Sequence, residues 1–188
     1  MVSPYFVPRD KGVEWLLSLR QRGVRVVVVT NSLRSTDVLP VHAGYARSRK
    51  ALLQAGVELW EIREDPVRQD RQRRGLGHSA SSLHAKTFAV DRRQFFVGSF
   101  NLDPRSADIN TEMGIVVDSA SLAGAAVDRL FTALPAQAYQ LRLDRNGDIE
   151  WVAQVDGREV VYHNEPNADL WLRFKVGVLG LLPIEGQL

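Results

Sequence analysis

The β-branched run at positions 24–30, Val-Arg-Val-Val-Val-Val-Thr, is the feature that most constrains the fold of this chain. An apolar run of this kind is typical of a strand that is covered on both faces. The segment before it, residues 10–23, carries an apolar stripe at helical spacing and ends at a glycine. A second helix is predicted over residues 41–54 and a second strand over residues 57–62. This alternation predicts an α/β protein with a mixed, largely parallel sheet.

The first residues of the chain also have the pattern of a buried strand. This strand is predicted over residues 2–7, with Pro4 and Pro8 near its ends. Because a domain rarely opens on a core strand at its second residue, we expect the chain to be the C-terminal part of a longer protein.

The remaining residues predict a loop followed by more strands and helices. Residues 63–82 are rich in arginine, glycine and serine, which favours a loop. The further predicted elements are strands at 83–91, 94–100 and 112–118 and helices at 119–134 and 168–181. Asn146-Gly147 and Asp156-Gly157 are turn signals between alternating runs, and they predict a three-stranded meander. We expect two parts, residues 1–135 and a meander with a helix, residues 136–188, packed on them.

Composition excludes several classes of function. The 188 residues include no cysteine, which excludes a disulfide framework, a thiol nucleophile and thiolate metal ligands. We expect neither a signal peptide nor a membrane helix, because no apolar run approaches the ~20 residues that a span needs.

The net charge is +2, and four of the 24 basic residues are lysines. Arginine suits bidentate phosphate binding, although genomic base composition produces the same bias.

Polar residues follow the first long predicted strand, in the loop over residues 31–40. Ligands collect at the carboxyl ends of strands in open α/β sheets, so Asn31, Ser32 and Asp37 are candidates for substrate binding. The same residue types also suit ordinary turn and capping chemistry. His42, in the first turn of the next helix, is either a phosphate contact at a helix N-terminus or a surface helix residue.

The segment that carries chemistry is His84-Ala-Lys86, followed by Gly98-Ser99-Phe-Asn101. Two residues apart on a strand, His84 and Lys86 point to the same face. A second strand returns Ser99 and Asn101 to the same patch. Lys86 and Asn101 can hold the non-bridging oxygens of a phosphodiester, and Ser99 can add a donor. His84 can then attack phosphorus.

A nucleophilic imidazole must be neutral and fixed in one tautomer. A carboxylate bonded to its second nitrogen does this, and Glu112 is the best candidate nearby in sequence. Arg105, shortly after Asn101, is a further candidate for phosphate contact.

The pattern HxKxxxxD followed by GSxN resembles the phospholipase D superfamily. Every fixed position of the pattern matches, at His84, Lys86, Asp91, Gly98, Ser99 and Asn101. The resemblance implies an α/β/α sandwich in which two such motifs face each other. One histidine forms a phosphohistidine, and the other protonates the leaving alcohol and later activates the acceptor. The resemblance implies no metal and no other cofactor.

The resemblance also assigns roles to the remaining motif residues. In the superfamily the motif aspartate mostly supports the loop, so Asp91, like Gly98, is expected to be structural. The carboxylate that orients the histidine lies downstream of GSxN, which matches Glu112 in Asn-Thr-Glu-Met-Gly.

More of the sequence is similar to bacterial cardiolipin synthases of the C type. The similar segments are residues 3–8, 30–37, 40–45, 98–106, 110–114, 164–166 and 182–185. They cover essentially the whole chain, but only the C-terminal half of such an enzyme. The implied reaction moves a phosphatidyl group onto the free hydroxyl of phosphatidylglycerol. Anionic phospholipids would then be the substrates, and the protein would be cytoplasmic and peripheral on the inner membrane.

The chain departs from this family in having one motif where such enzymes carry two. None of the other histidines, at positions 42, 78 and 163, has a lysine two residues on. Three alternatives remain open. Two copies pair, as small single-motif nucleases of the superfamily do; the missing half lies on another chain; or the chain is a truncated and inactive fragment.

Two surface features have more than one interpretation. The arginines at positions 68, 71, 73 and 74 either face an anionic membrane or belong to a solvated loop. Acidic residues at 61, 64, 65 and 70 interrupt them, which disfavours nucleic acid as a partner. The apolar residues at 171, 172, 174, 178, 181 and 182 either pack on the core or dock at a membrane interface.

Overall fold

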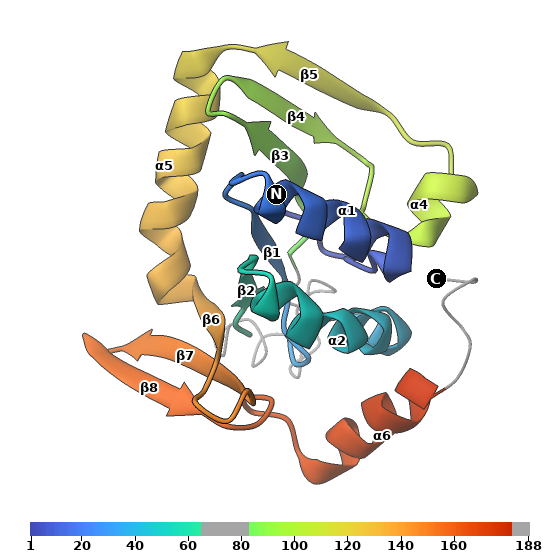
Figure 1. Ribbon diagram of the computed structural model, residues 1–188, viewed down its shortest axis with the longest axis vertical. Coiled ribbons are helices and arrows are strands. Elements are labelled where there is room, and N and C mark those ends of the chain that lie inside the picture. The colour runs from blue at the N-terminus through green and yellow to red at the C-terminus, as the bar shows by residue number, and fades with distance from the viewer. Residues whose placement is uncertain (65–82, 182–188) are drawn as a thin grey trace, which may run out of the picture.

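The computed structural model describes residues 1–64 and 83–181 (Figure 1). Its described helices are α1 (Arg9–Gln21), α2 (Leu39–Gln54), α4 (Pro104–Asp108), α5 (Ala120–Gln137) and α6 (Leu170–Leu181). Its described strands are β1 (Val27–Asn31), β2 (Glu58–Ile62), β3 (Lys86–Val90), β4 (Gln94–Gly98), β5 (Gly114–Asp118), β6 (Ala138–Leu143), β7 (Ile149–Val155) and β8 (Arg158–Tyr162). The structure therefore confirms the α/β class that the sequence predicts.

The strands form two sheets, one mixed and one antiparallel. The five-stranded sheet has the order β1-β2-β6-β7-β8, and the three-stranded sheet has the order β3-β4-β5. Only β1 and β2 pair in parallel among the described strands, and the other pairs are antiparallel. The sheet is thus mixed, as predicted, but it is not largely parallel. Short turns join β3 to β4, β6 to β7 and β7 to β8, and strands joined by such turns must run antiparallel.

The first residues link the two sheets. Val2 bridges Val29 of β1 on one side and Thr87 of β3 on the other. Its amide donates to the Thr87 carbonyl oxygen at 2.7 Å and its carbonyl accepts from the Thr87 amide at 3.0 Å. Phe6 bridges Leu102, just beyond β4. The segment is not the continuous strand predicted over residues 2–7, and Pro4, which has no amide hydrogen, lies between the two bridges.

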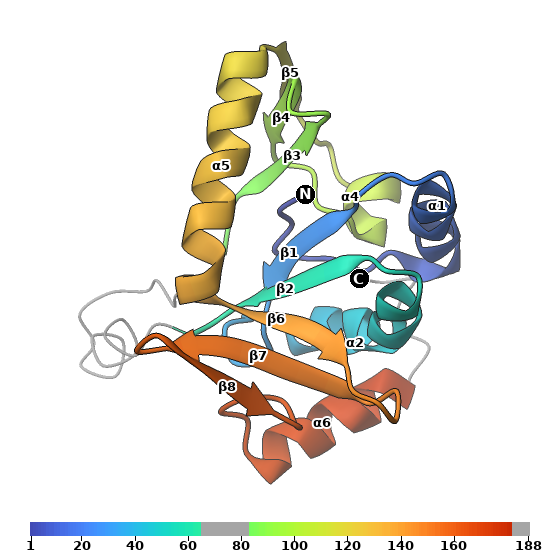
Figure 2. The ribbon, with the colours of Figure 1, turned by 60° about the vertical axis from the view of Figure 1, so that its left-hand side comes forward.

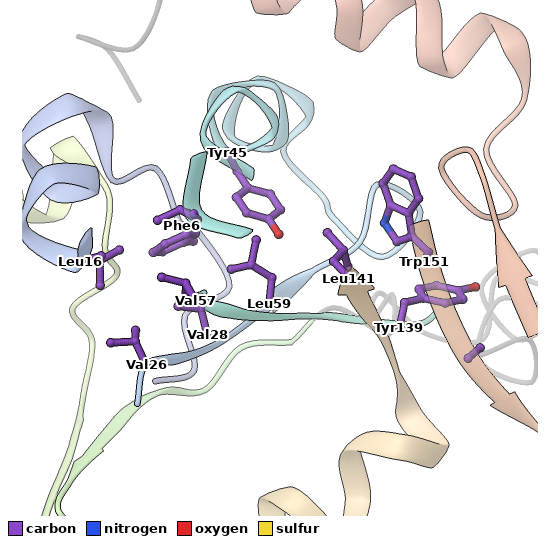
Figure 3. Close-up of a cluster of buried hydrophobic side chains, with 12 residues drawn as sticks. Phe6, Leu16, Val26, Val28, Tyr45, Val57, Leu59, Tyr139, Leu141 and Trp151 are labelled. Carbon is purple, nitrogen blue, oxygen red and sulfur yellow. The ribbon is translucent and has the colours of Figure 1, made fainter. Parts of the chain in front are cut away.

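Helices cover both faces of the five-stranded sheet. Val28 packs in a cluster with Leu16 of α1 and Tyr45 of α2 (Figure 3). The next residue, Val29, points to the other face, where it packs with Leu134 of α5. Figure 2 shows the same division, with α5 on one side and both α1 and α2 on the other. This core holds β1 in place beside the hairpin that carries the motif.

The meander at β6–β8 forms where the turn signals predict it. Gly147 has a φ of 79°, and Asp156 and Gly157 have φ values of 51° and 75°. Positive φ values at both central residues suit a tight hairpin turn. The meander is joined to the main sheet, because β6 pairs with β2 from Leu59 to Ile62. The last helix, α6, packs against α2 through its apolar residues.

Gly98 is expected to tolerate no side chain. A β-carbon at this position would lie 2.7 Å from the Gly114 α-carbon on the paired strand β5. We expect Gly98→Ala to lower the free energy of unfolding by about 1–3 kcal/mol, because neighbouring backbone must move. Gly177→Ala is the matched control, because a β-carbon at Gly177 in α6 meets no atom within 4 Å. The control should gain up to about 1 kcal/mol from helix propensity. Urea denaturation measures both, and equal stability of the two variants would contradict the expected clash.

Candidate functional site

The β3–β4 hairpin carries the motif residues. Lys86 opens β3 and pairs with Gly98, which closes β4, so Ser99 and Asn101 leave β4 beside Lys86. The strand is shorter than the predicted 83–91, and His84 lies in the extended segment before it, with its side chain exposed. Lys86 Nζ donates to the carbonyl oxygen of His84 at 3.0 Å. Three of the predicted residues thus meet at one end of the hairpin, and His84 approaches them from the preceding segment.

Hydrogen bonds join Ser99 to the Glu112 side chain and to the backbone of Met113. The Ser99 amide donates to the Met113 carbonyl oxygen at 2.8 Å, and the Met113 amide donates to Ser99 Oγ at 3.0 Å. Ser99 Oγ donates in turn to the Glu112 carboxylate. Hydrogen bonds from Ser99 and Ser106 lower the pKa of Glu112 below its usual value. Glu112 is therefore an ionised acceptor next to the hairpin at neutral pH.

The predicted bond between Glu112 and His84 is not present in this structure. Among residues 1–64 and 83–181, no side chain forms a hydrogen bond with the His84 imidazole, and the carboxylate of Glu112 accepts from Ser99 and Asn110. The orienting role of Glu112 stays a prediction.

Lys86 lies in an acidic environment. Burial lowers its pKa, and the nearby carboxylates of Glu112, Asp103 and Asp37 oppose that shift. Its ammonium also lies over the ring of Tyr5, 6.0 Å from the centroid. These carboxylates oppose the approach of an anion, but Lys86 forms no salt bridge with a described residue, so its ammonium can still donate to a phosphodiester oxygen.

Asn101 is buried, and its side-chain oxygen has no hydrogen-bond partner among the described residues. The backbone around it is fixed by the short helix α4. The Asn101 amide donates to Ser106 Oγ at 3.3 Å, and the Ser106 amide donates to the Asp103 carboxylate, which caps the helix, at 2.8 Å. Buried polar atoms without partners are rare, and contact with a ligand is one explanation for such an atom. The position therefore suits a residue that contacts a ligand.

Tyr5 and Asp103 lie next to the site, and neither of them was among the site residues predicted from the sequence. The Tyr5 hydroxyl donates to the two oxygens of the Asp37 carboxylate at 3.1 and 3.0 Å. Burial and Asp37 raise the pKa of Tyr5 to about 12. Asp103 followed by a proline is a helix-start pattern, which could have located α4. For Tyr5, the available signal was its position between Pro4 and Pro8, in a segment that resembles the family.

Asn31 and Ser32 lie behind the site and are buried. The side-chain oxygen of Asn31 accepts from the Leu83 amide at 2.9 Å, and its nitrogen donates to the Pro4 carbonyl oxygen at 3.4 Å. Ser32 Oγ lies 3.1 Å from Ser35 Oγ. Asn31 therefore holds the backbone of Leu83, the residue that precedes His84. A direct substrate contact of Asn31 or Ser32 stays a prediction.

His42 and Arg105 lie in contrasting surroundings. His42 is buried, and its Nε2 lies 2.8 Å from an Arg49 guanidinium nitrogen and 3.3 Å from the Glu165 carboxylate. It is neither a surface residue nor open to a phosphate from solvent. The sequence signal was Arg49, two helical turns on and on the same face as His42. Arg105 is exposed on α4, just after Asn101.

Asp91 lies in the turn between β3 and β4. It has a φ of 51°, its neighbour Arg92 a φ of 54°, and both side chains are exposed. The turn is at the opposite end of β3 from Lys86. This position is compatible with the structural role expected of Asp91. The arginines at 68, 71, 73 and 74, the histidine at 78 and residues 182–185 lie outside the described residues.

Two solved structures share this fold. The crystal structure of Nuc, a phospholipase D family member from Salmonella typhimurium, has a TM-score of 0.55 and covers 76% of this chain and 80% of that chain. Phosphatidylserine synthase from Haemophilus influenzae Rd KW20 has a TM-score of 0.52 and covers 75% of this chain and 33% of that chain. The sequence identities are 20% and 15%, so these likenesses show the fold alone.

Several relatives share a higher sequence identity with this chain than these two structures do. The chain is 46% identical to cardiolipin synthase C of Escherichia coli (strain K12), over 98% of this chain and 40% of the relative. It is 35% identical to an uncharacterized protein of Helicobacter pylori (strain J99 / ATCC 700824), over 92% of this chain and 34% of the relative. Cardiolipin synthase A of Citrobacter koseri is 31% identical over 66% of this chain and 22% of the relative. The chain therefore spans less than half the length of these relatives.

The family comparison covers most of the chain. Residues 1–134 match the family model described as "Cardiolipin synthase, PLD-like domain". The matched range includes every residue of the HxKxxxxD and GSxN patterns. The chain belongs to the family of phospholipase D-like domains of cardiolipin synthases.

Proposed function

We propose that the chain is one half-site of a phosphatidyltransferase that makes cardiolipin through a phosphohistidine. Residues 1–135 would form the catalytic half, and residues 136–188 the meander and helix that pack on it. The observation that carries the proposal is the meeting of Lys86, Ser99 and Glu112 at the end of the β3–β4 hairpin, beside an exposed His84. The 46% identity to a cardiolipin synthase over 98% of the chain supports the same substrate class.

The first half-reaction follows from this arrangement. A neutral imidazole nitrogen of His84 attacks phosphorus of the donor lipid, and the bond from phosphorus to the headgroup oxygen breaks. Lys86 and Asn101 hold the non-bridging oxygens as charge grows on them. The leaving headgroup oxygen takes a proton from an acid, which this half-site does not supply. Asp91 and Gly98 shape the hairpin and stay outside the reacting groups.

The second half-reaction reverses the first with a new alcohol. The hydroxyl oxygen of phosphatidylglycerol attacks the phosphohistidine, loses its proton to a base and releases His84. Both proton transfers need a second histidine on the far side of the phosphorus. We propose that this histidine comes from a second half, either in another copy of this chain or in a different chain. Asp37, with Tyr5 bonded to it, and Arg105 are the candidates for contacts with the substrate alcohol and phosphate.

One surface near the motif supports the docking of a second half. Residues of β3 that share a face with Lys86 are Phe88 and Val90, and the paired strands place Val116 on that face too. Phe88, Val90 and Val116 are exposed. Exposed apolar side chains grouped on one face are typical of an interaction surface, and this group runs along the face of the hairpin from the Lys86 end to the Asp91 turn.

The substrates place the proposed reaction at a bilayer. Within the described residues, no helix has the length and apolar character needed to cross a membrane. We therefore propose peripheral attachment at the cytoplasmic side of the inner membrane, where anionic phospholipids would be both donor and acceptor.

A direct assay tests the proposal. The chain is supplied with phosphatidylglycerol vesicles and a phosphatidyl donor, and separately with single-stranded DNA. Cardiolipin, detected by mass spectrometry, is the expected product in the first reaction, and the DNA should stay intact. Release of nucleotides without cardiolipin would contradict the proposal and favour a phosphodiester hydrolase. Failure of both reactions, in a chain shown to be folded and self-associated, would favour a non-catalytic fragment.

A further inference from the structure

The last described helix, α6, has two apolar faces, and only one of them is packed. Leu172, Val176 and Leu179 lie against a cluster that includes Leu33 and Ala43. On the other side, a stripe of large apolar residues faces solvent: Leu170, Trp171, Phe174, Val178 and Leu181. These five residues recur at helical spacing and form one continuous face, which we call the α6 stripe. Figure 2 shows α6 at the periphery, beyond α2 and the β7–β8 hairpin.

Exposure of the α6 stripe is large. Leu181 is 83% exposed, Trp171 62% and Phe174 60%. The rings of Trp171 and Phe174 are stacked, with centroids 5.7 Å apart and an interplanar angle of 16°. Two aromatic rings side by side on an exposed helix face are unusual for a surface that meets only water.

The two charged side chains within α6 are both basic, and one exposed acid, Asp169, lies just before the helix, where its carboxylate accepts from the Leu172 amide. Arg173 and Lys175 lie on the two borders of the α6 stripe, as helical spacing places them. Lys175 Nζ lies 5.1 Å from the centroid of the Trp171 ring. Aromatic rings with flanking basic residues match the boundary between headgroups and acyl chains in an anionic bilayer.

We infer that the α6 stripe is an interfacial docking site for an anionic lipid bilayer. The helix has 12 residues, about 18 Å at 1.5 Å per residue, which is too short to span a bilayer and long enough to lie in its surface. The basic side chains of Arg173 and Lys175 complement the negative charge of an anionic bilayer, which favours a bilayer over a second protein as the partner of this face. This docking site rests on the peripheral attachment proposed above and names the surface that would contact lipid, and its test measures lipid binding and not turnover.

Vesicle flotation tests the inference. The chain is mixed with vesicles of phosphatidylcholine alone or with added phosphatidylglycerol, and the bound fraction is measured. We expect binding only to the anionic vesicles. The variant Trp171→Ser/Lys175→Glu should bind at least about tenfold more weakly, because it removes a cation and an exposed aromatic side chain that the bilayer would cover.

The first helix provides a matched control. Lys11 and Trp15 have the same four-residue spacing on α1 and are both exposed. The variant Trp15→Ser/Lys11→Glu changes the same residue types and the same net charge, so it should bind anionic vesicles like the unmodified chain. A circular dichroism melt of both variants establishes that each is folded before binding is compared.

Three outcomes would overturn the inference. The first is equal vesicle binding by the two double variants, and the second is no binding by the unmodified chain. The third is a dimer in sedimentation velocity that the Trp171→Ser/Lys175→Glu variant converts to a monomer while vesicle binding persists, because the stripe would then be a protein interface. Cardiolipin formation is not read in this experiment, so a failure of the proposed transferase activity leaves its result unaffected.

Discussion

Replacing Arg49 with methionine is expected to lower the free energy of unfolding by about 3–5 kcal/mol. The Arg49 guanidinium is buried between two carboxylates, 2.8 Å from Glu61 and in contact with Glu165. Glu61 also accepts from the indole nitrogen of Trp151 at 3.0 Å. Removal of the cation would leave two buried negative groups, with only His42 near Glu165 to compensate them. Urea denaturation at pH 7, followed by tryptophan fluorescence, measures the loss.

The effect of Arg49→Met should depend on pH. Burial is the largest single influence on Glu165 and acts to raise its pKa, but Arg49 and His42, through their charges and hydrogen bonds, together outweigh burial and hold that pKa at about 2, below the ordinary 4.5. This carboxylate therefore stabilises the fold above pH 4.5, and its contribution is lost as the pH falls toward 2. Without Arg49, burial alone would raise the pKa of Glu165, as it already raises that of Glu61. The variant should recover part of its stability between pH 7 and pH 5 as the carboxylates take up protons.

An exposed arginine provides the control for Arg49→Met. Arg142 pairs with Glu150 and Glu159 at the surface of the meander, and pairs of this kind contribute about 0–1 kcal/mol. Arg142→Met should therefore change stability little and show no gain at pH 5. If Arg49→Met lost no more than Arg142→Met, the buried network would not be a major source of stability. Should Arg49→Met fail to fold, Glu165→Gln provides a milder change, and this variant should lose less stability than the unmodified chain as the pH falls from 4.5 toward 2, because it lacks the carboxylate whose pKa is lowered.

Replacing His84 with alanine is expected to reduce cardiolipin formation by about 10³-fold or more, because it removes the proposed nucleophile. The side chain is exposed and has no hydrogen-bond partner among the described residues, so folding should not suffer. His163→Ala is the matched control, since His163 is 70% exposed and pairs with Glu150 on the meander. Equal turnover by the two alanine variants would rule out His84 as the nucleophile.

The Asp91→Asn variant tests whether Asp91 takes part in the reaction or only supports the turn between β3 and β4. Asparagine accepts the left-handed backbone that Asp91 adopts, at a φ of 51°, so the turn should persist. We expect turnover within a few-fold of the unmodified chain. Complete loss of activity in a well-folded Asp91→Asn variant would contradict the structural role given to this residue.

Local patterns predicted most helices and strands, but not how distant segments pair. The valine run, the glycine that ends α1 and the two Gly-containing turns of the meander each act within a few residues. The pairing of β6 with β2 joins Leu141 to Leu59, which lie far apart in the sequence, and no local signal specifies its direction. The start of β3 at Lys86 likewise depends on a distant contact, because Asn31 holds Leu83 just before it.

The candidate site was predictable where its residues follow one another on a hairpin. Lys86 and Ser99 come together because β3 and β4 pair in a register that the spacing of the motif allows. His42 was harder to place, because its burial depends on Arg49 and on Glu165 from the tail of the chain. Tyr5 reaches the site only because the first residues bridge β1 and β3.

A substrate with a leaving group that departs without a proton tests the central proposal most directly. With a phosphatidyl p-nitrophenol, the half-site needs no second histidine for the first step, so His84 alone should suffice. We expect a burst of about one p-nitrophenolate per chain and a phosphatidyl adduct on His84, detected by mass spectrometry after quenching in base. The burst should vanish in His84→Ala and persist in His163→Ala. Absence of a burst in the folded chain, or an equal burst in His84→Ala, would contradict the phosphohistidine half-site.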